Sequence, residues 1–116
     1  MDLRKQFAVT AQLDHIAINT ADFEETVCFF KEVLGMDEMR QTGIRPSRKT
    51  WFQQGIQVCE ITDAGHENDV YGHIAIRVSD KADVLEKAKA YGCMMVEGKN
   101  GWILTPDGII IELLTI

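Results

Sequence analysis

The segment His-Ile-Ala-Ile occurs twice in this chain, at residues 15–18 and again 58 residues later at 73–76. Each copy begins with one of the three histidines of a 116-residue chain. The signals that follow the two copies come in the same order, which is typical of an internal repeat. Each repeat is too short to bury a sheet face alone, so we expect the two copies to depend on each other.

A helix is predicted after each copy. Asp22 and Asp80 are suited to cap these helices, and Gly35 and Gly92 to end them in a left-handed turn. Apolar residues recur at helical spacing between cap and glycine. They are Val27, Phe30 and Leu34 in the first helix, and Val84, Leu85, Ala88 and Tyr91 in the second.

Three extended stretches follow each predicted helix. They cover about 36–41, 49–54 and 56–62 in the first half, and 93–97, 102–105 and 109–114 in the second. Each half is therefore predicted as β-α-β-β-β, and the fold class as α+β. We expect a single domain over residues 1–116, with module one at about 12–63 and module two at about 70–116.

The charge balance narrows the choice of partner. Asp and Glu number 18 against 12 Lys and Arg, so the net charge of −6 argues against nucleic acid and anionic membranes and favours a small molecule. No segment has the apolar run of a secretory signal or a membrane span, which predicts a cytoplasmic protein. Cys28, Cys59 and Cys93 are odd in number and widely spaced, so we expect reduced, structural cysteines.

Alternation along a strand separates the histidines from the isoleucines. Ile16 and Ile18 share one face, which we expect to pack on the helix, whereas His15 points to the other face. The second copy repeats this pattern with His73. The histidine face is therefore free to line a cavity.

A glutamate lies in the apolar last strand of each half, Glu60 in one and Glu112 in the other. A buried carboxylate requires a partner or a cation. Two imidazoles and two carboxylates suit Zn²⁺, Ni²⁺, Co²⁺, Fe²⁺ or Mn²⁺. Taken singly, a strand histidine is more often structural and such a glutamate more often exposed. Their repetition favours one duplicated metal site formed by His15, Glu60, His73 and Glu112.

Other polar and aromatic residues have ordinary interpretations. His66 is expected in a solvated loop, and Asp107 in a turn. Three aromatic residues on middle strands, Trp51, Phe52 and Trp102, suit either the core or the wall of the site.

The segments "DHIAINTADFEETVCFFKEVLGM", "YGHIAIRVSD" and "TPDGIIIELL" resemble the vicinal oxygen chelate superfamily over about residues 13–114. This superfamily includes glyoxalase I, methylmalonyl-CoA epimerase, extradiol dioxygenases and metal-free bleomycin-resistance proteins. The resemblance implies a curved mixed sheet around a cavity and a homodimer whose sites are shared between chains. It also implies metal ligands on the first and last strand of each half, which fall on His15, Glu60, His73 and Glu112.

A His, Glu, His, Glu set resembles glyoxalase I most, whereas methylmalonyl-CoA epimerases typically have Gln at the second position. The implied activity is a metal-dependent lyase or isomerase reaction. A proton moves on an α-hydroxy carbonyl or hemithioacetal-like substrate through a metal-stabilised enediolate. Glu112 is the implied base, and Glu60 a ligand and second base. The alternatives are a small-molecule binding protein of the antibiotic-resistance type and an epimerase.

The chain departs from the glyoxalases at the positions that hold glutathione. Asn19 stands where they have an arginine, and Ala64 where they have an asparagine. Arg45, Arg48 and Lys49 could supply anion contacts instead, or form a solvated charged turn.

Overall fold

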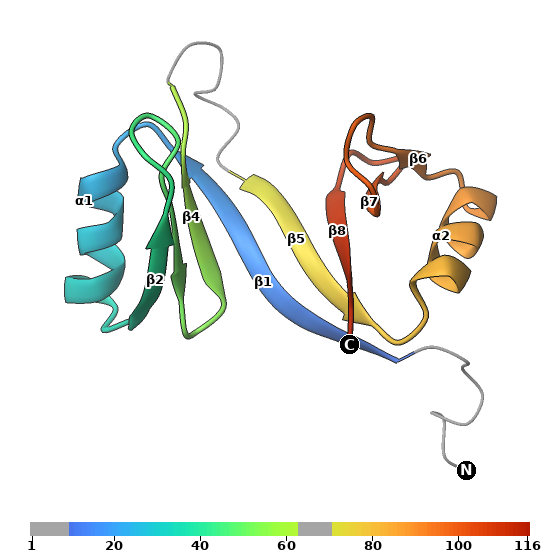
Figure 1. The fold of residues 1–116 in the computed structure, drawn as a ribbon, viewed down its shortest axis with the longest axis horizontal. Helices are drawn as coiled ribbons and strands as arrows, with labels where there is room; N and C mark the ends of the chain where they lie inside the picture. The colour runs from blue at the N-terminus through green and yellow to red at the C-terminus, as the bar shows by residue number, and fades with distance from the viewer. Residues whose placement is uncertain (1–9, 63–70) are drawn as a thin grey trace. The chain divides into compact units, whose positions relative to one another are not determined.

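The computed structural model describes residues 10–62 and 71–116, and each module has the predicted order of elements (Figure 1). The first contains β1 (Ala11–Thr20), α1 (Phe23–Cys28), η2 (Phe29–Val33), β2 (Glu38–Thr42), β3 (Lys49–Phe52) and β4 (Ile56–Glu60). The second contains β5 (Tyr71–Val78), α2 (Lys81–Ala90), β6 (Met94–Met95), β7 (Trp102–Leu104) and β8 (Ile110–Thr115). The predicted α+β class with two β-α-β-β-β modules is confirmed.

Contacts divide the chain within β1. The first unit is His15–Gly72, and the second unit is Met1–Asp14 together with His73–Ile116. In the second unit, Thr10 N donates to Ser79 Oγ at 3.0 Å and Ser79 N donates to Thr10 O at 3.1 Å. Arg77 Nε donates to Asp14 Oδ1 at 2.6 Å. The start of β1 therefore groups with module two. The predicted boundary between the modules, in the segment 63–70, lies outside the described residues.

The two units repeat one strand order. The first unit has the order β2-β3-β4-β1, with β4 parallel to β1 and the other pairs antiparallel. The second has β6-β7-β8-β5, with β8 parallel to β5. The strand that begins each module therefore always lies beside the strand that ends it.

The first predicted helix is confirmed in position but changes its winding. Asp22 accepts a hydrogen bond from Glu25 N at 3.3 Å, and Gly35 has a φ of 69°. Between them α1 passes into the π-helical turn η2, where Leu34 N bonds to Phe29 O. Because this wider turn rotates later residues around the axis, Leu34 is 51% exposed and the predicted apolar stripe is wrong at this position.

The second helix follows the prediction more closely. Asp80 accepts from Asp83 N at 3.0 Å, and Gly92 has a φ of 90°. Tyr91 is exposed, contrary to prediction, because it forms the C-cap and has left the helical backbone conformation.

Each unit has its own apolar core between helix and sheet. The core of the first unit contains Phe23, Val27, Phe52 and Val58, with Ile18, Phe30, Met36 and Ile56 packed against it. That of the second contains Val78, Ile103 and Leu113, with Ile76, Val84, Leu85, Ala88, Cys93 and Ile111. Phe52 is thus a core residue.

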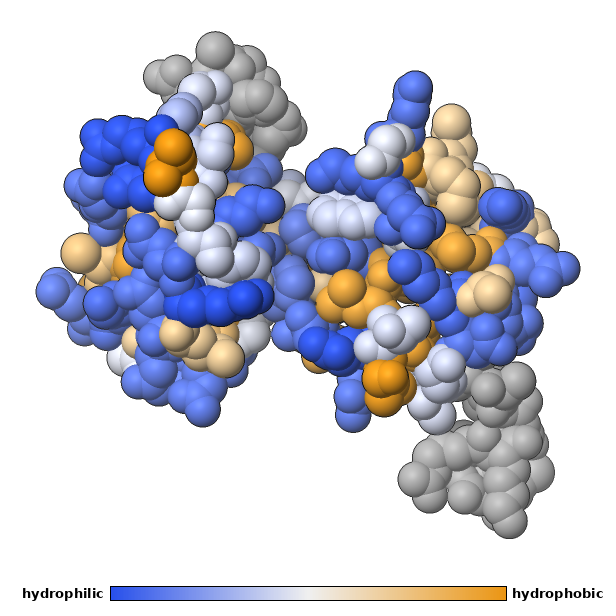
Figure 2. All heavy atoms as spheres, in the orientation of Figure 1, coloured by the Kyte–Doolittle hydropathy of each residue, from blue (hydrophilic) through white to orange (hydrophobic). Residues whose placement is uncertain are grey.

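The surface of both units is mainly hydrophilic in the view of Figure 2, with apolar residues scattered among the polar ones. Among the described residues, no helix is both long and apolar enough to cross a membrane.

Candidate functional site

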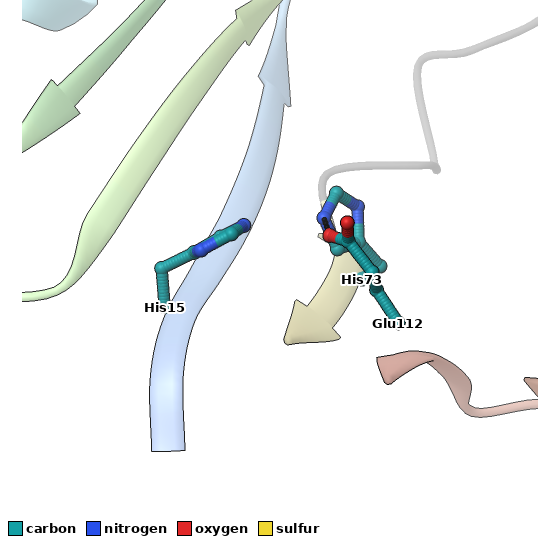
Figure 3. Close-up of side chains that lie close together, drawn as sticks. All are labelled: His15, His73 and Glu112. Carbon is teal, nitrogen blue, oxygen red and sulfur yellow. Dashed lines mark ion pairs between the residues drawn. The ribbon is translucent and has the colours of Figure 1, made fainter. Parts of the chain in front are cut away.

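His73 and Glu112 lie side by side in the second unit. The parallel register of β5 and β8 pairs Ala75 with Glu112, and residues paired in a sheet share a face. Because Ala75 and His73 are two residues apart, Glu112 lies on the histidine face. His73 Nε2 is 3.2 Å from Glu112 Oε1, and the side chains are 12% and 22% exposed (Figure 3). The prediction that His73 and Glu112 share a face is confirmed.

Trp102 covers this pair from the next strand. It stands opposite Glu112 in the register of β7 and β8, and its ring centroid is 4.4 Å from that of His73. Lys99 Nζ lies 4.3 Å above the Trp102 ring. The second unit therefore has a row of four neighbouring side chains, which are His73, Glu112, Trp102 and Lys99.

His15 begins the equivalent row in the first unit. It is 8% exposed on β1, and it is also drawn in Figure 3. The register of β1 and β4 pairs Ala17 with Gln57, as Ala75 pairs with Glu112 in the other unit. Trp51 stands opposite Gln57 on β3, as Trp102 stands opposite Glu112. Gln57 is therefore the structural counterpart of Glu112.

The Gln57 side chain is buried without a partner for its oxygen. The residue is 4% exposed, and Oε1 accepts no hydrogen bond from the described residues. Buried amide oxygens are nearly always satisfied, and one that is not costs about 1–3 kcal/mol. The Gln57 oxygen therefore requires a donor or a cation that the described residues do not supply.

The prediction that Glu60 shares a face with His15 is wrong. Glu60 pairs with Thr20, five residues beyond His15 and about 16 Å further along the strand. Alternation places Glu60 on the same face as Val58, which belongs to the core under α1. In the second unit its counterpart is Thr115, which pairs with Val78.

Arg48 binds both carboxylate oxygens of Glu60. Arg48 Nε donates to Oε1 at 2.9 Å and Nη2 to Oε2 at 2.7 Å, while the Arg48 backbone N also donates to Oε1 at 3.1 Å. Glu24 accepts from Arg48 Nη1 at 3.0 Å, and the Arg48 guanidinium lies 4.7 Å above the Phe23 ring.

These bonds lower the pKa of Glu60 from 4.5 to about 2, chiefly through the hydrogen bonds from Arg48. A carboxylate with this pKa is a poor proton acceptor near neutral pH. Arg45 and Arg48 both pair with Glu24, so the predicted alternative of anion contacts is not supported for either of them.

The remaining predictions concern single residues. His66 and Ala64 lie outside the described residues. Asp107 lies in a turn in which Gly108 N bonds to Thr105 O at 2.9 Å, as predicted. Cys28, Cys59 and Cys93 form no disulfide in the described part of the chain, and Cys28 is exposed rather than structural.

A family model described as the Glyoxalase/Bleomycin resistance protein/Dioxygenase superfamily matches residues 12–113. No curated protein sequence matches the chain.

Solved structures share the fold at low sequence identity. A hypothetical protein from Bacillus halodurans C-125 has a TM-score of 0.70 at 17% identity, and the match covers 92% of this chain and 95% of that one. Methylmalonyl-CoA epimerase from Mycobacterium tuberculosis has a TM-score of 0.68 at 20% identity, covering 89% and 86%.

A Streptomyces coelicolor methylmalonyl-CoA epimerase variant in complex with 2-nitronate-propionyl-CoA has a TM-score of 0.65 at 21% identity, covering 90% and 96%. These likenesses support the fold, and the family model spans both modules. The chain belongs to the glyoxalase/bleomycin resistance protein/dioxygenase superfamily.

Proposed function

We propose that this protein is a metal-dependent isomerase that moves a proton at a carbon beside a carbonyl group, and that it is an epimerase rather than a glyoxalase I. The proposed ligands are His15 and Gln57 from the first unit, and His73 and Glu112 from the second. Gln57 replaces Glu60 of the sequence prediction. The observation that supports this most is the repeated register, in which Gln57 occupies the position of Glu112.

The residues present fit a divalent cation. The Gln57 oxygen is buried and lacks a partner among the described residues, and a cation would satisfy it. His15, His73 and Glu112 are residue types that ligate divalent ions. Two imidazoles, one amide oxygen and one carboxylate suit Zn²⁺, Ni²⁺, Co²⁺, Fe²⁺ or Mn²⁺.

Glutamine at this position favours the epimerase alternative. The resemblance described above implies a glutamine as the second ligand in methylmalonyl-CoA epimerases and a glutamate in glyoxalase I. Several structures that share the fold are methylmalonyl-CoA epimerases. The proposed substrate is accordingly an acyl thioester or a similar compound with an acidic C–H next to a carbonyl.

Glu112 is the proposed base. A divalent ion bound by these ligands would supply the positive charge that stabilises the oxyanion formed when the proton leaves. Glu112 would accept the proton on one carboxylate oxygen, and His73, whose Nε2 lies 3.2 Å from Glu112 Oε1, would hold the metal ion beside it. Trp102 packs on the His73 ring and would exclude water from the pair.

The second candidate function is a glyoxalase-type reaction, in which a proton shifts between neighbouring carbons of the substrate. One base on one side of the substrate suffices for it, and Glu112 is the one carboxylate in the two described rows. Incubation of methylmalonyl-CoA in D₂O separates the candidates. Deuterium at the α-carbon with loss of configuration supports the epimerase, whereas turnover of a hemithioacetal without exchange of the thioester supports the second candidate.

Metal titration tests the ligand set directly. Stripped protein is titrated with Ni²⁺, Co²⁺ and Zn²⁺ by calorimetry, and about one ion per chain is expected. His15→Ala, Gln57→Met and His73→Ala should each weaken binding by at least about tenfold. Glu60→Gln is the matched control and should leave affinity unchanged. If Glu60→Gln weakens binding and Gln57→Met does not, the assignment of Gln57 is wrong.

The predicted homodimer with shared sites has its own test. His15→Ala and Glu112→Gln are each expected to be inactive. If one site takes its ligands from two chains, mixed dimers of these variants contain one intact site, and about a quarter of the activity per site returns on mixing. If mixing restores nothing while exchange of subunits is verified, the site belongs to one chain.

A further inference from the structure

Two cations of the first unit, Arg40 and Lys49, share the face that holds Gln57. Arg40 stands opposite Trp51, and Trp51 stands opposite Gln57, so these three side chains form one row across β2, β3 and β4. Lys49 lies two residues from Trp51 on the same strand and therefore on the same face. Neighbouring strands are about 4.8 Å apart, which puts the Arg40 Cα about 10 Å from the Gln57 Cα.

Neither cation has an acidic partner among the described residues. The other described cations of this unit all do, because Lys31 pairs with Glu38, Arg45 with Glu24, and Arg48 with Glu60 and Glu24.

The face itself also lacks acidic residues within the described strands. The rows of paired residues place on it His15, Ala17, Asn19, Arg40, Thr42, Lys49, Trp51, Gln57 and Cys59. In a chain with a net charge of −6, a cationic face of this kind is a locally favourable site for anions.

Arg40 is held by Trp51. Its guanidinium carbon lies 4.2 Å from the centroid of the Trp51 ring, which restrains the side chain through a cation–π contact. A guanidinium that stacks on a ring leaves its N–H edge available, and this edge matches the two oxygens of a carboxylate or phosphate. Lys49 adds a second positive charge, on a residue about 7 Å along the strand from Trp51.

We propose that Arg40 and Lys49 form a binding subsite for an anionic group of the substrate, a carboxylate or a phosphate. This proposal rests on the proposed function and deepens it, because it gives the substrate an anionic group that binds two strands away from Gln57. The subsite itself lies within the first unit.

The test uses metal-free protein and two small anions as probes. In Trp102→Phe, Trp51 is the only tryptophan of the chain, so its fluorescence reports directly on the Arg40 stack. Inorganic phosphate and succinate are titrated separately at low ionic strength, with calorimetry as a second readout. We expect saturable binding of at least one probe, and the tighter of the two identifies the anionic group.

Matched variants separate a built site from general electrostatics. Arg40→Gln and Lys49→Gln should each weaken binding by about tenfold, a typical loss for one charged hydrogen bond. Lys89→Gln makes the same change of charge at an exposed lysine of the second unit and should leave affinity unchanged.

Two results would overturn the subsite: no saturable binding of either probe by fluorescence and calorimetry, or equal weakening in Lys89→Gln. Because these titrations contain no metal and require no turnover, they are independent of the metal titration proposed above. A protein that binds no metal would disprove the isomerase proposal without affecting the anion result. A protein that binds no anion would disprove the subsite without affecting the metal result.

Discussion

The two units have the same backbone plan and differ in the chemistry placed on it. At the position opposite the central alanine, the first unit has the neutral amide of Gln57 and the second has the carboxylate of Glu112. Three residues later the first unit has Glu60, bound by Arg48, and the second has Thr115. The two units therefore share one backbone frame, whereas their carboxylates, Glu60 and Glu112, lie on opposite faces of it.

The largest expected effect comes from exchanging these two ligands. Glu112→Gln should lower kcat by about 10²–10⁴-fold, because it removes the base. Gln57→Glu places a carboxylate where the first unit has a neutral amide and should reduce kcat by less than about tenfold. Deuterium incorporation into methylmalonyl-CoA, followed by NMR, measures both. Equal losses in the two variants would show that the halves do not divide the roles of ligand and base.

Core substitutions test whether the units depend on each other. Phe52→Ala in the first unit should destabilise by about 3–5 kcal/mol, and Ile103→Ala in the second by about 2–5 kcal/mol, through lost burial and cavity formation. Since each repeat is small, we expect a single cooperative transition in urea for both variants. Two separate transitions, one of which shifts in each variant, would show that the units fold independently.

A pH-dependent stability term at acidic pH is expected from Glu60 in the first unit. The pKa of Glu60 is lowered from 4.5 to about 2, so its ion pair stabilises the fold fully above pH 4.5. That contribution is lost as the pH falls from 4.5 through 2. Glu60→Gln should lower Tm by several degrees at pH 7, and the difference from wild type should vanish near pH 2.

Thr115→Val, at the counterpart position in the second unit, is the matched control for this measurement. Its effect on Tm should not change with pH. A constant difference between Glu60→Gln and wild type from pH 7 to 2 would contradict the assignment of the ion pair.

The smallest expected effects are at the helix caps. Asp22→Ala and Asp80→Ala should each lower the free energy of unfolding by about 0.5–2 kcal/mol. The Asp80 cap bond is shorter, 3.0 Å against 3.3 Å, so we expect the larger loss in the second unit. Urea unfolding measures both, and a larger loss for Asp22→Ala would mean that the cap supports the π-helical turn as well.

The repeat, the caps and the face of each histidine could be predicted because they depend on local spacing. Glu60 was misplaced because the prediction matched residue types instead of strand register, which depends on pairing between distant segments. Alternation within "IQVCE" contained the missing signal, since Glu60 shares its face with the core residue Val58 and Gln57 does not. Leu34 and Tyr91 were misplaced because a π-turn and a helix end change the 3.6-residue period.

The duplicated alanine has an evolutionary consequence. Ala17 and Ala75 are both completely buried, and each stands directly opposite the side chain that distinguishes its unit. Because neither alanine has exposed surface, a longer side chain at either position would have to displace its neighbours. Of the three apolar residues in the repeat, we therefore expect alanine to be the least replaceable, whereas isoleucine can exchange with other apolar residues of similar volume.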